Sequence, residues 1–153
     1  GSEPDLERVN IYDEIAKVSD YMSKRAPRKV TFDFPAATDG VEMVNLNPLL
    51  FDWVIENLLR NGLDALEGKG ELIGQILIDP NFVTINISDT GKGIPQNKFA
   101  SVFKPGFTTK QRGWGLGLSL AKRIIEEYHK GKIFVKESEL GKGTTFSVVL
   151  PRI

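Results

Sequence analysis

Two asparagine side chains share one face of a predicted helix with an arginine and an aspartate. The segment ENLLRNGLDALE, residues 56–67, has helical periodicity. With Asn57 at zero and about 100° per residue, Arg60, Asn61 and Asp64 fall at about 300°, 40° and 340°. The opposite face is apolar and consists of Ile55, Leu58, Leu59, Leu63 and Leu66. Because amide oxygens suit a hydrated Mg²⁺ that takes other ligands from substrate phosphates, this helix indicates a nucleotide site.

A short glycine-rich turn follows the next predicted pair of strands. Asp89 ends a strand and precedes Thr90-Gly91-Lys92-Gly93-Ile94-Pro95. A carboxylate here can accept a hydrogen bond from a purine amine, and flanking glycines let the backbone approach a flat base. By itself, however, the pattern is more typical of a strand-ending turn in which the carboxylate caps nearby amides.

A second glycine cluster lies directly ahead of an amphipathic helix. Gly113, Gly115 and Gly117 alternate in the segment RGWGLGLSLAKRII. Free backbone amides at a helix N-terminus form a phosphate cradle, although this spacing is neither a Walker loop nor a dinucleotide fingerprint. A flexible linker into a helix is the alternative. Basic side chains that could neutralise phosphate charge are Lys104, Lys110 and Arg112.

Between the glycine clusters, Phe103 and Phe107 stand four residues apart in a polar segment. We interpret both as apolar anchors that fasten the segment to the core. A loop held at two hydrophobic points can still open and close over a ligand, so the segment is a candidate lid.

Composition limits the possible function classes. The chain of 153 residues carries 20 acidic and 20 basic side chains and no cysteine. This length predicts a single domain over residues 1–153, with Gly1-Ser2 interpreted as a scar of tag removal. Balanced charge argues against a nucleic-acid binder or membrane-surface protein, and the lack of cysteine excludes thiolate sites. No apolar run approaches the roughly 20 residues that cross a bilayer.

The apolar pattern predicts alternating helices and strands. Strands at 29–34 and 41–46 flank the turn signal Asp39-Gly40 and are predicted to form a hairpin. Asn47-Pro48 opens the long helix, which Gly68 to Gly70 close. The other expected elements are an extended segment at 9–11, helices at 12–26, 97–102 and 116–129, and strands at 74–78, 83–88, 133–136 and 144–150. We therefore expect an α+β fold, a two-layer sandwich with helices on one face of a mixed sheet.

Five motifs occur in a definite order along the chain: Asn57-x-x-x-Asn61, Asp89-x-Gly91-x-Gly93, Phe103-x-x-x-Phe107, Gly113-x-Gly115-x-Gly117 and Gly141-x-Gly143-Thr144. Together they resemble the catalytic ATP-binding domain of sensor histidine kinases. That family belongs to the superfamily of gyrase, heat-shock chaperone, histidine kinase and mismatch-repair ATPases. The resemblance covers residues 9–151 and implies the Bergerat-type ATP-binding fold.

The resemblance implies a site for ATP and Mg²⁺. It implies that Asn61 ligates the metal, with Asn57 near the metal and phosphates. It also implies that Asp89 binds the adenine amine and that Thr144 supports the base through water. The remaining implied nucleotide contacts are Gly91, Gly93, Ile94, Phe107, Thr108, Lys110, Gly113, Gly115, Leu116, Gly117 and Leu118.

Two positions depart from the family pattern. Asp64 stands where many members carry a basic residue. Arg60, about 40° away on the same helix face, is our candidate to supply the charge instead. Trp114 stands where a small hydroxyl residue is frequent, and both ligand stacking and lid anchoring remain open for it.

The implied activity is transfer of the ATP γ-phosphoryl to a histidine on a dimerisation and phosphotransfer domain absent from this chain. His129 is the only histidine. We interpret it as a positive-capable side chain near a helix C-terminus, before a capping Gly131, and not as the acceptor. The resemblance implies two partners, the dimerisation and phosphotransfer domain and a response regulator. It also implies that the parent protein is a homodimer and that it does not bind nucleic acid. The expected location is cytoplasmic, in a parent that is either free or membrane-anchored.

Two alternatives remain open. An autonomous ATPase of the gyrase or chaperone type would use a glutamate base four residues before the metal asparagine, where this chain has Asn57. Glu56 is about 100° away around the helix and is poorly aimed. The other alternative is an ATP-binding regulatory module without turnover. ATP hydrolysis by this chain alone discriminates the first from a kinase domain.

Overall fold

A computed structural model describes residues 4–106 and 117–153. In chain order, its strands, helices, 3₁₀ turns (η1 to η3) and π-turn (η4) are β1 (Glu7–Asn10), α1 (Ile11–Ser23), β2 (Lys29–Asp33), η1 (Ala37–Asp39), β3 (Met43–Leu46), α2 (Pro48–Leu66), β4 (Lys69–Ile78), β5 (Phe82–Asp89), η2 (Gln96–Lys98), η3 (Ser101–Phe103), α3 (Gly117–Arg123), η4 (Ile124–Tyr128), β6 (Lys132–Glu139) and β7 (Gly143–Pro151). Among these described residues, no helix combines the length and apolar character needed to cross a membrane.

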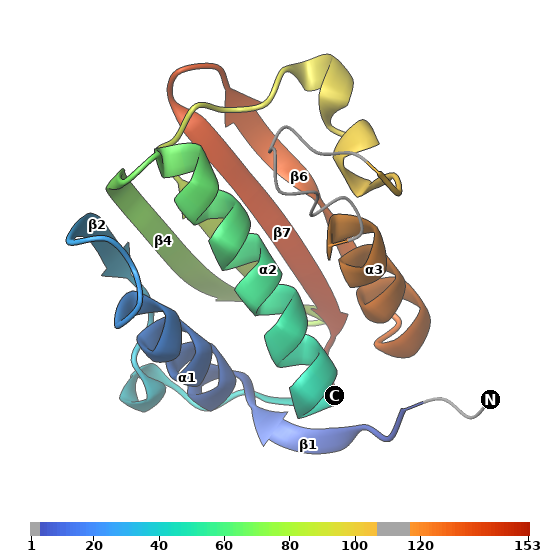
Figure 1. Ribbon diagram of the computed structural model, residues 1–153. Coiled ribbons are helices and arrows are strands. Elements are labelled where there is room, and N and C mark those ends of the chain that lie inside the picture. Colours follow the sequence, from blue (N-terminus) through green and yellow to red (C-terminus); the bar gives the residue numbers. More distant parts are fainter. Residues whose placement is uncertain (1–3, 107–116) are drawn as a thin grey trace.

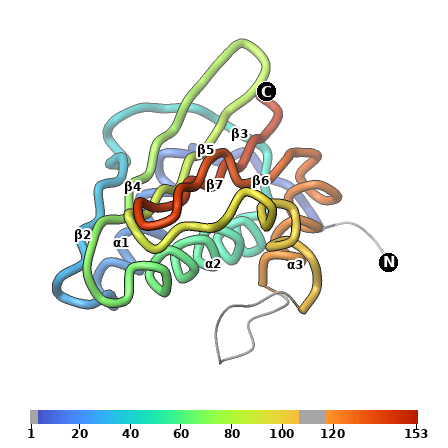
Figure 2. Tube along the Cα trace, turned by 90° about the horizontal axis from the view of Figure 1, so that it is seen from above, coloured from blue at the N-terminus to red at the C-terminus, as the bar shows by residue number. Residues whose placement is uncertain are grey.

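One face of a five-stranded sheet carries all three α-helices. The strand order is β2-β4-β5-β7-β6. Strands β2 and β4 run parallel, while the other neighbouring pairs are antiparallel. Figure 1 shows α1, α2 and α3 lying across the sheet, and the view from above in Figure 2 places them on the same side. The predicted two-layer α+β sandwich with a mixed sheet is confirmed.

The predicted hairpin of residues 29–34 and 41–46 is wrong. Strand β2 pairs with β4, so that Lys29 lies opposite Lys69, whereas β3 pairs with β1 in a separate two-stranded sheet. The Asn10 side chain fixes this arrangement, because its Oδ1 accepts the Glu42 N–H at 3.0 Å and its Nδ2 donates to the Gly40 carbonyl at 3.3 Å. Strand β3 therefore pairs with β1 and not with β2.

Helix α2 begins and ends as its sequence predicts. The Asn47 side chain accepts the Leu50 N–H at 3.0 Å, and Pro48 occupies the first turn, where its missing N–H costs nothing. At the other end Glu67 adopts a left-handed conformation with φ 54°, followed by Gly68 with φ 93°. The apolar face of the helix is fully buried at Phe51, Val54, Ile55, Leu58 and Leu59.

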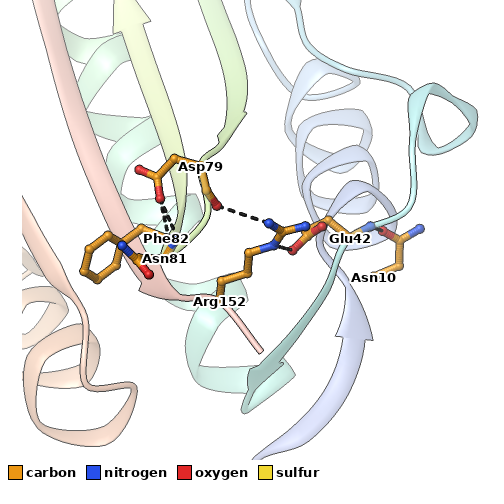
Figure 3. Close-up of polar contacts among 6 residues, drawn as sticks. All are labelled: Asn10, Glu42, Asp79, Asn81, Phe82 and Arg152. Carbon is orange, nitrogen blue, oxygen red and sulfur yellow. Dashed lines mark hydrogen bonds and ion pairs between the residues drawn. The ribbon is translucent and has the colours of Figure 1, made fainter.

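A network of hydrogen bonds lies at the end of the sheet where β5 begins (Figure 3). Asp79 in the turn before β5 accepts the Asn81 N–H through Oδ1 at 2.8 Å. Arg152, just after β7, donates from Nε to Glu42 at 2.9 Å and from Nη1 to the Asp79 carbonyl at 3.3 Å. The Glu42 N–H in turn donates to Asn10. The network therefore joins the main sheet to the small one.

The predicted helix over residues 116–129 is observed in two parts. Regular α-helix extends over α3 only, and the chain then widens into the π-turn η4, in which the His129 N–H donates to the Ile124 carbonyl at 3.2 Å. The residue that ends this segment in a left-handed conformation is Lys130, with φ 57°, rather than the predicted Gly131.

Candidate functional site

Helix α2 places the two asparagines differently. Asn57 is buried, with 9% of its surface exposed, and its Nδ2 donates to the Trp53 carbonyl one turn earlier at 2.8 Å. Asn61 is half-buried on the next turn, while Arg60 and Asp64 are exposed. The sequence placed all four on the face away from the apolar residues. It did not predict that Asn57 would be covered.

The first residue of α3 covers Asn57. A Cβ atom built on Gly117 would lie 2.9 Å from Asn57 Oδ1, closer than real Cβ contacts allow. Because Asn57 Nδ2 is engaged with Trp53, the amide oxygen is the group that faces α3. An oxygen held beside a helix N-terminus without a side chain is a suitable neighbour for a metal-bound phosphate.

We expect Gly117→Ala to weaken nucleotide binding without destabilising the fold. The added methyl group must displace the Asn57 amide oxygen, whereas alanine is a better helix former than glycine. Mg-ATP affinity should fall about tenfold, the equivalent of about 1.4 kcal/mol, while the melting temperature stays equal or rises. Titration calorimetry and thermal melts test this, with Arg123→Ala on the exposed side of α3 as control. A lower melting temperature with unchanged affinity would contradict the assignment.

Asp89 lies at the end of β5, opposite Thr144 of β7. Its carboxylate is 9% exposed and Oδ1 accepts the Gly91 N–H at 2.9 Å. Burial raises the pKa of Asp89, and hydrogen bonds from the backbone N–H groups of Gly91 and Thr144 oppose that shift. The predicted capping interaction is therefore present. Burial also leaves the carboxylate in a desolvated environment, where a hydrogen bond from a ligand would be strong.

Gly62 lets α2 pack closely on Leu72 of β4, beside Asp89. A Cβ atom at Gly62 would lie 2.5 Å from Leu72 Cδ2 and 3.7 Å from Asp89 Oδ2. Because Gly62 directly follows Asn61, Asn61 lies on the part of α2 that packs beside Asp89. Gly62 was not among the predicted site residues. Its signal was a glycine inside an otherwise strongly helical, leucine-rich segment.

The glycine-rich turn is held between α2 and the β6–β7 turn. A Cβ atom at Gly91 would lie 2.6 Å from the Ala65 carbonyl oxygen, and the Lys92 N–H donates to that same carbonyl at 3.2 Å. Gly93 has φ 81°, a left-handed conformation that favours glycine, and a Cβ there would meet the Glu139 carbonyl. Both glycines are thus required by close backbone contacts.

Ser138 links two residues that the sequence implicated separately. Its Oγ accepts the Ile94 N–H at 2.7 Å and lies 2.7 Å from the Thr144 hydroxyl. A pocket of about 330 Å³ opens here; its lining consists of Asp89, Glu137, Ser138, Glu139, Lys142, Gly143, Thr144 and Thr145. The sequence analysis missed Ser138, because a serine in a polar strand carries no distinguishing local signal.

The segment after β5 is anchored to the core by Phe103. This side chain is 8% exposed and packs edge-to-face on Phe146, with ring centroids 6.0 Å apart. The predicted anchoring role of Phe103 is confirmed. Leu118 is half-buried against the core. Lys104, a candidate to neutralise phosphate charge, is exposed. The following predicted lid and phosphate residues lie outside the described residues: Phe107, Thr108, Lys110, Arg112, Gly113, Trp114, Gly115 and Leu116.

The prediction of a charge-bearing His129 is wrong. The residue is 3% exposed, and burial lowers the pKa of its imidazole, with a hydrogen bond to the Ile124 carbonyl acting in the opposite direction. Its Nδ1 lies 3.0 Å from that carbonyl oxygen, and its Nε2 accepts the Asn47 N–H at 3.1 Å. The ring is therefore neutral and inaccessible, which agrees with its exclusion as a phosphoacceptor.

The candidate ligands for a metal ion are the side-chain amides of Asn57 and Asn61. Within residues 4–106 and 117–153, no group of three or more histidine, aspartate or glutamate side chains could hold an ion. Mg²⁺ commonly takes only one or two protein ligands and completes its shell with water and phosphate oxygens. The half-buried Asn61 and the Asn57 Oδ1 beside Gly117 fit that mode of binding.

Comparisons with known proteins identify the family. A model described as "Histidine kinase-, DNA gyrase B-, and HSP90-like ATPase" matches residues 47–153. Sporulation kinase C of Bacillus subtilis (strain 168) is 38% identical over 114 residues, covering 74% of this chain and 26% of that protein. Sensor histidine kinase ZraS of Salmonella typhi is 34% identical over 150 residues, covering 97% of this chain and 32% of that protein. The chain thus spans about a third or less of these relatives.

Solved structures share the fold. The catalytic domain of histidine kinase ThkA superimposes with a TM-score of 0.82 at 24% identity, covering 97% of each chain. A mycobacterial sensor histidine kinase, MprB, gives a TM-score of 0.82 at 23% identity, covering 96% of this chain and 97% of that one. The predicted resemblance to histidine kinase catalytic domains is confirmed. Because the family model spans more than half of the sequence, the chain belongs to the histidine kinase-, DNA gyrase B- and HSP90-like ATPases.

Proposed function

We propose that this chain is the Mg-ATP-binding catalytic domain of a sensor histidine kinase. In this proposal it donates the ATP γ-phosphoryl to a histidine on a dimerisation and phosphoacceptor domain outside the chain. The observation that carries the proposal is the packing of α2 on the sheet beside Asp89 of β5. Asn61 lies on α2 directly before Gly62, and a Cβ atom at Gly62 would lie 3.7 Å from the carboxylate oxygen Oδ2 of the buried Asp89.

Asp89 recognises the purine in this proposal. Its carboxylate accepts a hydrogen bond from the exocyclic amine of adenine, and Gly91 and Gly93 let the turn beside it pack against α2 and the β6–β7 turn. Thr144, held through Ser138 to Ile94, supports the base through water. In support, a pocket of about 330 Å³ is lined by both Asp89 and Thr144.

The amides of α2 hold the metal and phosphates. Asn61 ligates Mg²⁺ and Asn57 lies beside it, while Arg60 supplies positive charge from the same helix. The ion, when bound, neutralises charge that develops on the transferred phosphoryl. The other proposed contacts to the triphosphate are Lys110 and the alternating glycines Gly113, Gly115 and Gly117.

Phosphoryl transfer, rather than hydrolysis, is favoured by the residue at position 57. A general base for water must lie within hydrogen-bond reach of it, and Asn57 carries no basic group. The carboxylate adjacent in sequence, Glu56, is on a different side of α2 and lies 3.8 Å from the Arg60 guanidinium. The γ-phosphoryl is therefore preserved until an acceptor arrives.

The parent protein and its partners follow from the same proposal. We infer a cytoplasmic domain of a homodimeric parent that contains the phosphoacceptor histidine and transfers phosphate to a response regulator. In support, the histidine kinase ThkA, which shares the fold, has been crystallised in complex with the response regulator protein TrrA. Each element of this inference concerns sequence outside the present chain.

A phosphotransfer assay tests the proposed function. The purified chain should bind Mg-ATP yet hydrolyse it only slowly by itself. With γ-labelled ATP and a separately produced phosphoacceptor domain of the parent kinase, acid-labile, base-stable label should appear on that domain. An acceptor histidine replaced by glutamine provides the control. Rapid hydrolysis by the chain alone, with no transfer, would instead indicate an autonomous ATPase.

A further inference from the structure

The buried imidazole of His129 connects two helices that border the proposed nucleotide site. His129 directly follows the π-turn η4, which continues from α3, and it contacts Asn47 at the start of α2. Its Nε2 accepts the Asn47 N–H at 3.1 Å, so Nε2 carries no proton. The proton resides on Nδ1, which donates to the Ile124 carbonyl at 3.0 Å. The ring is thus a fixed neutral tautomer with both nitrogens engaged.

Asn47 hydrogen-bonds both to the first turn of α2 and to the segment before β1. Its side-chain Oδ1 accepts the Leu50 N–H at 3.0 Å, and its carbonyl accepts the Phe51 N–H at 2.9 Å, which together start α2. Its Nδ2 donates to the Asp5 carbonyl at 3.0 Å, just before β1. His129 therefore contacts the residue at which the N-terminal segment and α2 are joined.

The same two helical segments meet again at the proposed site. Gly117 at the start of α3 abuts Asn57 Oδ1 of α2. Asn57 is ten residues beyond Asn47, which corresponds to about 15 Å along a helix. The segment from Gly117 to His129 is thus fixed on α2 at both ends. Between these ends, Ala121, Ile124 and Ile125 are buried, so the segment is packed along its length and we expect a change at the His129 end to alter the position of Gly117.

We propose that His129 is a positioning residue for nucleotide binding. Its two hydrogen bonds set where the α3–η4 segment lies along α2, and this fixes Gly117 against the Asn57 amide oxygen. The inference rests on the proposed function, since the affected ligand is Mg-ATP. Through Asn47 and Asp5, the same contact connects the site to the N-terminal segment that precedes β1.

Two substitutions separate hydrogen bonding from packing. His129→Phe keeps an aromatic ring beside Phe51, whose ring centroid is 6.4 Å away. It removes the acceptor of the Asn47 N–H and the side-chain bond to the Ile124 carbonyl, which keeps only the bond from the backbone N–H of residue 129. We expect about tenfold weaker Mg-ATP binding, a size typical of positions that affect a site without touching it. His129→Gln keeps one donor and one acceptor at similar reach. It should bind within about threefold of the wild type.

A stability-matched control excludes a general loss of folding. Arg152→Met removes contacts to Glu42 and Asp79 at the end of the sheet where β5 begins, so it should lower the melting temperature but leave affinity unchanged. All affinities are measured by calorimetry well below the lowest melting temperature. If His129→Phe does not fold, His129→Asn, too short to span both partners, should show the same tenfold loss.

The outcomes distinguish this inference from the proposed function. Weak binding by His129→Phe or His129→Asn, rescued in His129→Gln and absent in Arg152→Met, supports a positioning role. Wild-type affinity in the folded His129→Phe or His129→Asn protein, despite a lower melting temperature, overturns it and leaves the proposed function intact. Failure of the wild-type chain to bind Mg-ATP would overturn the proposed function itself.

Discussion

Replacing Asn61 by alanine is expected to lower the affinity for Mg-ATP by about ten- to a hundredfold, the loss of one charge-assisted contact. The side chain is half-buried on the polar side of α2, so its removal should change the melting temperature little. The effect should depend on the ion, because the amide oxygen acts through Mg²⁺. With the metal chelated, the variant and wild type should bind nucleotide equally weakly.

Calorimetric titrations with and without chelator measure this dependence. The same substitution at Asn45, which is exposed on β3, is the matched control and should leave both affinities unchanged. Equal loss of affinity with and without Mg²⁺ would show that Asn61 contacts the nucleotide rather than the metal. Unchanged affinity in both conditions would remove Asn61 from the site.

Replacing Asp89 by asparagine is expected to abolish the preference for adenine nucleotides. The carboxylate can only accept hydrogen bonds, which suits the adenine amine, whereas an amide can also donate to the carbonyl of inosine. ATP affinity should fall about ten- to a hundredfold, and the loss for the inosine triphosphate should be much smaller. Equal losses for both nucleotides would mean that Asp89 only caps the glycine-rich turn.

The same substitution should change how stability depends on pH. Burial raises the pKa of Asp89 in the folded protein, so the folded state favours its protonated form. Its contribution to stability is present at low pH and is lost as the pH rises through the folded-state pKa. Asp89→Asn lacks this loss, so its melting temperature relative to wild type should rise between pH 4 and 7. Parallel pH profiles for the two proteins would contradict this explanation.

Elements whose signals are local were predicted well. The start of α2 follows from Asn47-Pro48, and its end from the glycines after Leu66. The strand pairing of residues 29–34 was predicted wrongly, because the partner is β4, distant in sequence, and local alternation does not specify which strand will be adjacent. The Asp39-Gly40 signal misled because Asp39 ends a 3₁₀ turn instead, accepting the Ala36 N–H at 2.8 Å.

In the site, too, features that lie within one element were predicted, whereas contacts between elements were not. The spacing of Asn57 and Asn61, and the position of Asp89 at a strand end, follow from periodicity along one element. The burial of Asn57 beneath Gly117 and the approach of Gly62 to Asp89 depend on how separate elements pack, which a helical wheel does not contain. The neutral state of His129 likewise depends on Asn47, which is far away in the sequence.

A crystal structure of the chain with Mg²⁺ and a nonhydrolysable ATP analogue tests the central claim most directly. We predict the adenine amine within hydrogen-bonding distance of the Asp89 carboxylate and the metal ion on the Asn61 amide oxygen, with the triphosphate running along α2 between them. Nucleotide bound elsewhere, or bound with its base away from Asp89 and its metal away from Asn61, would contradict the claim.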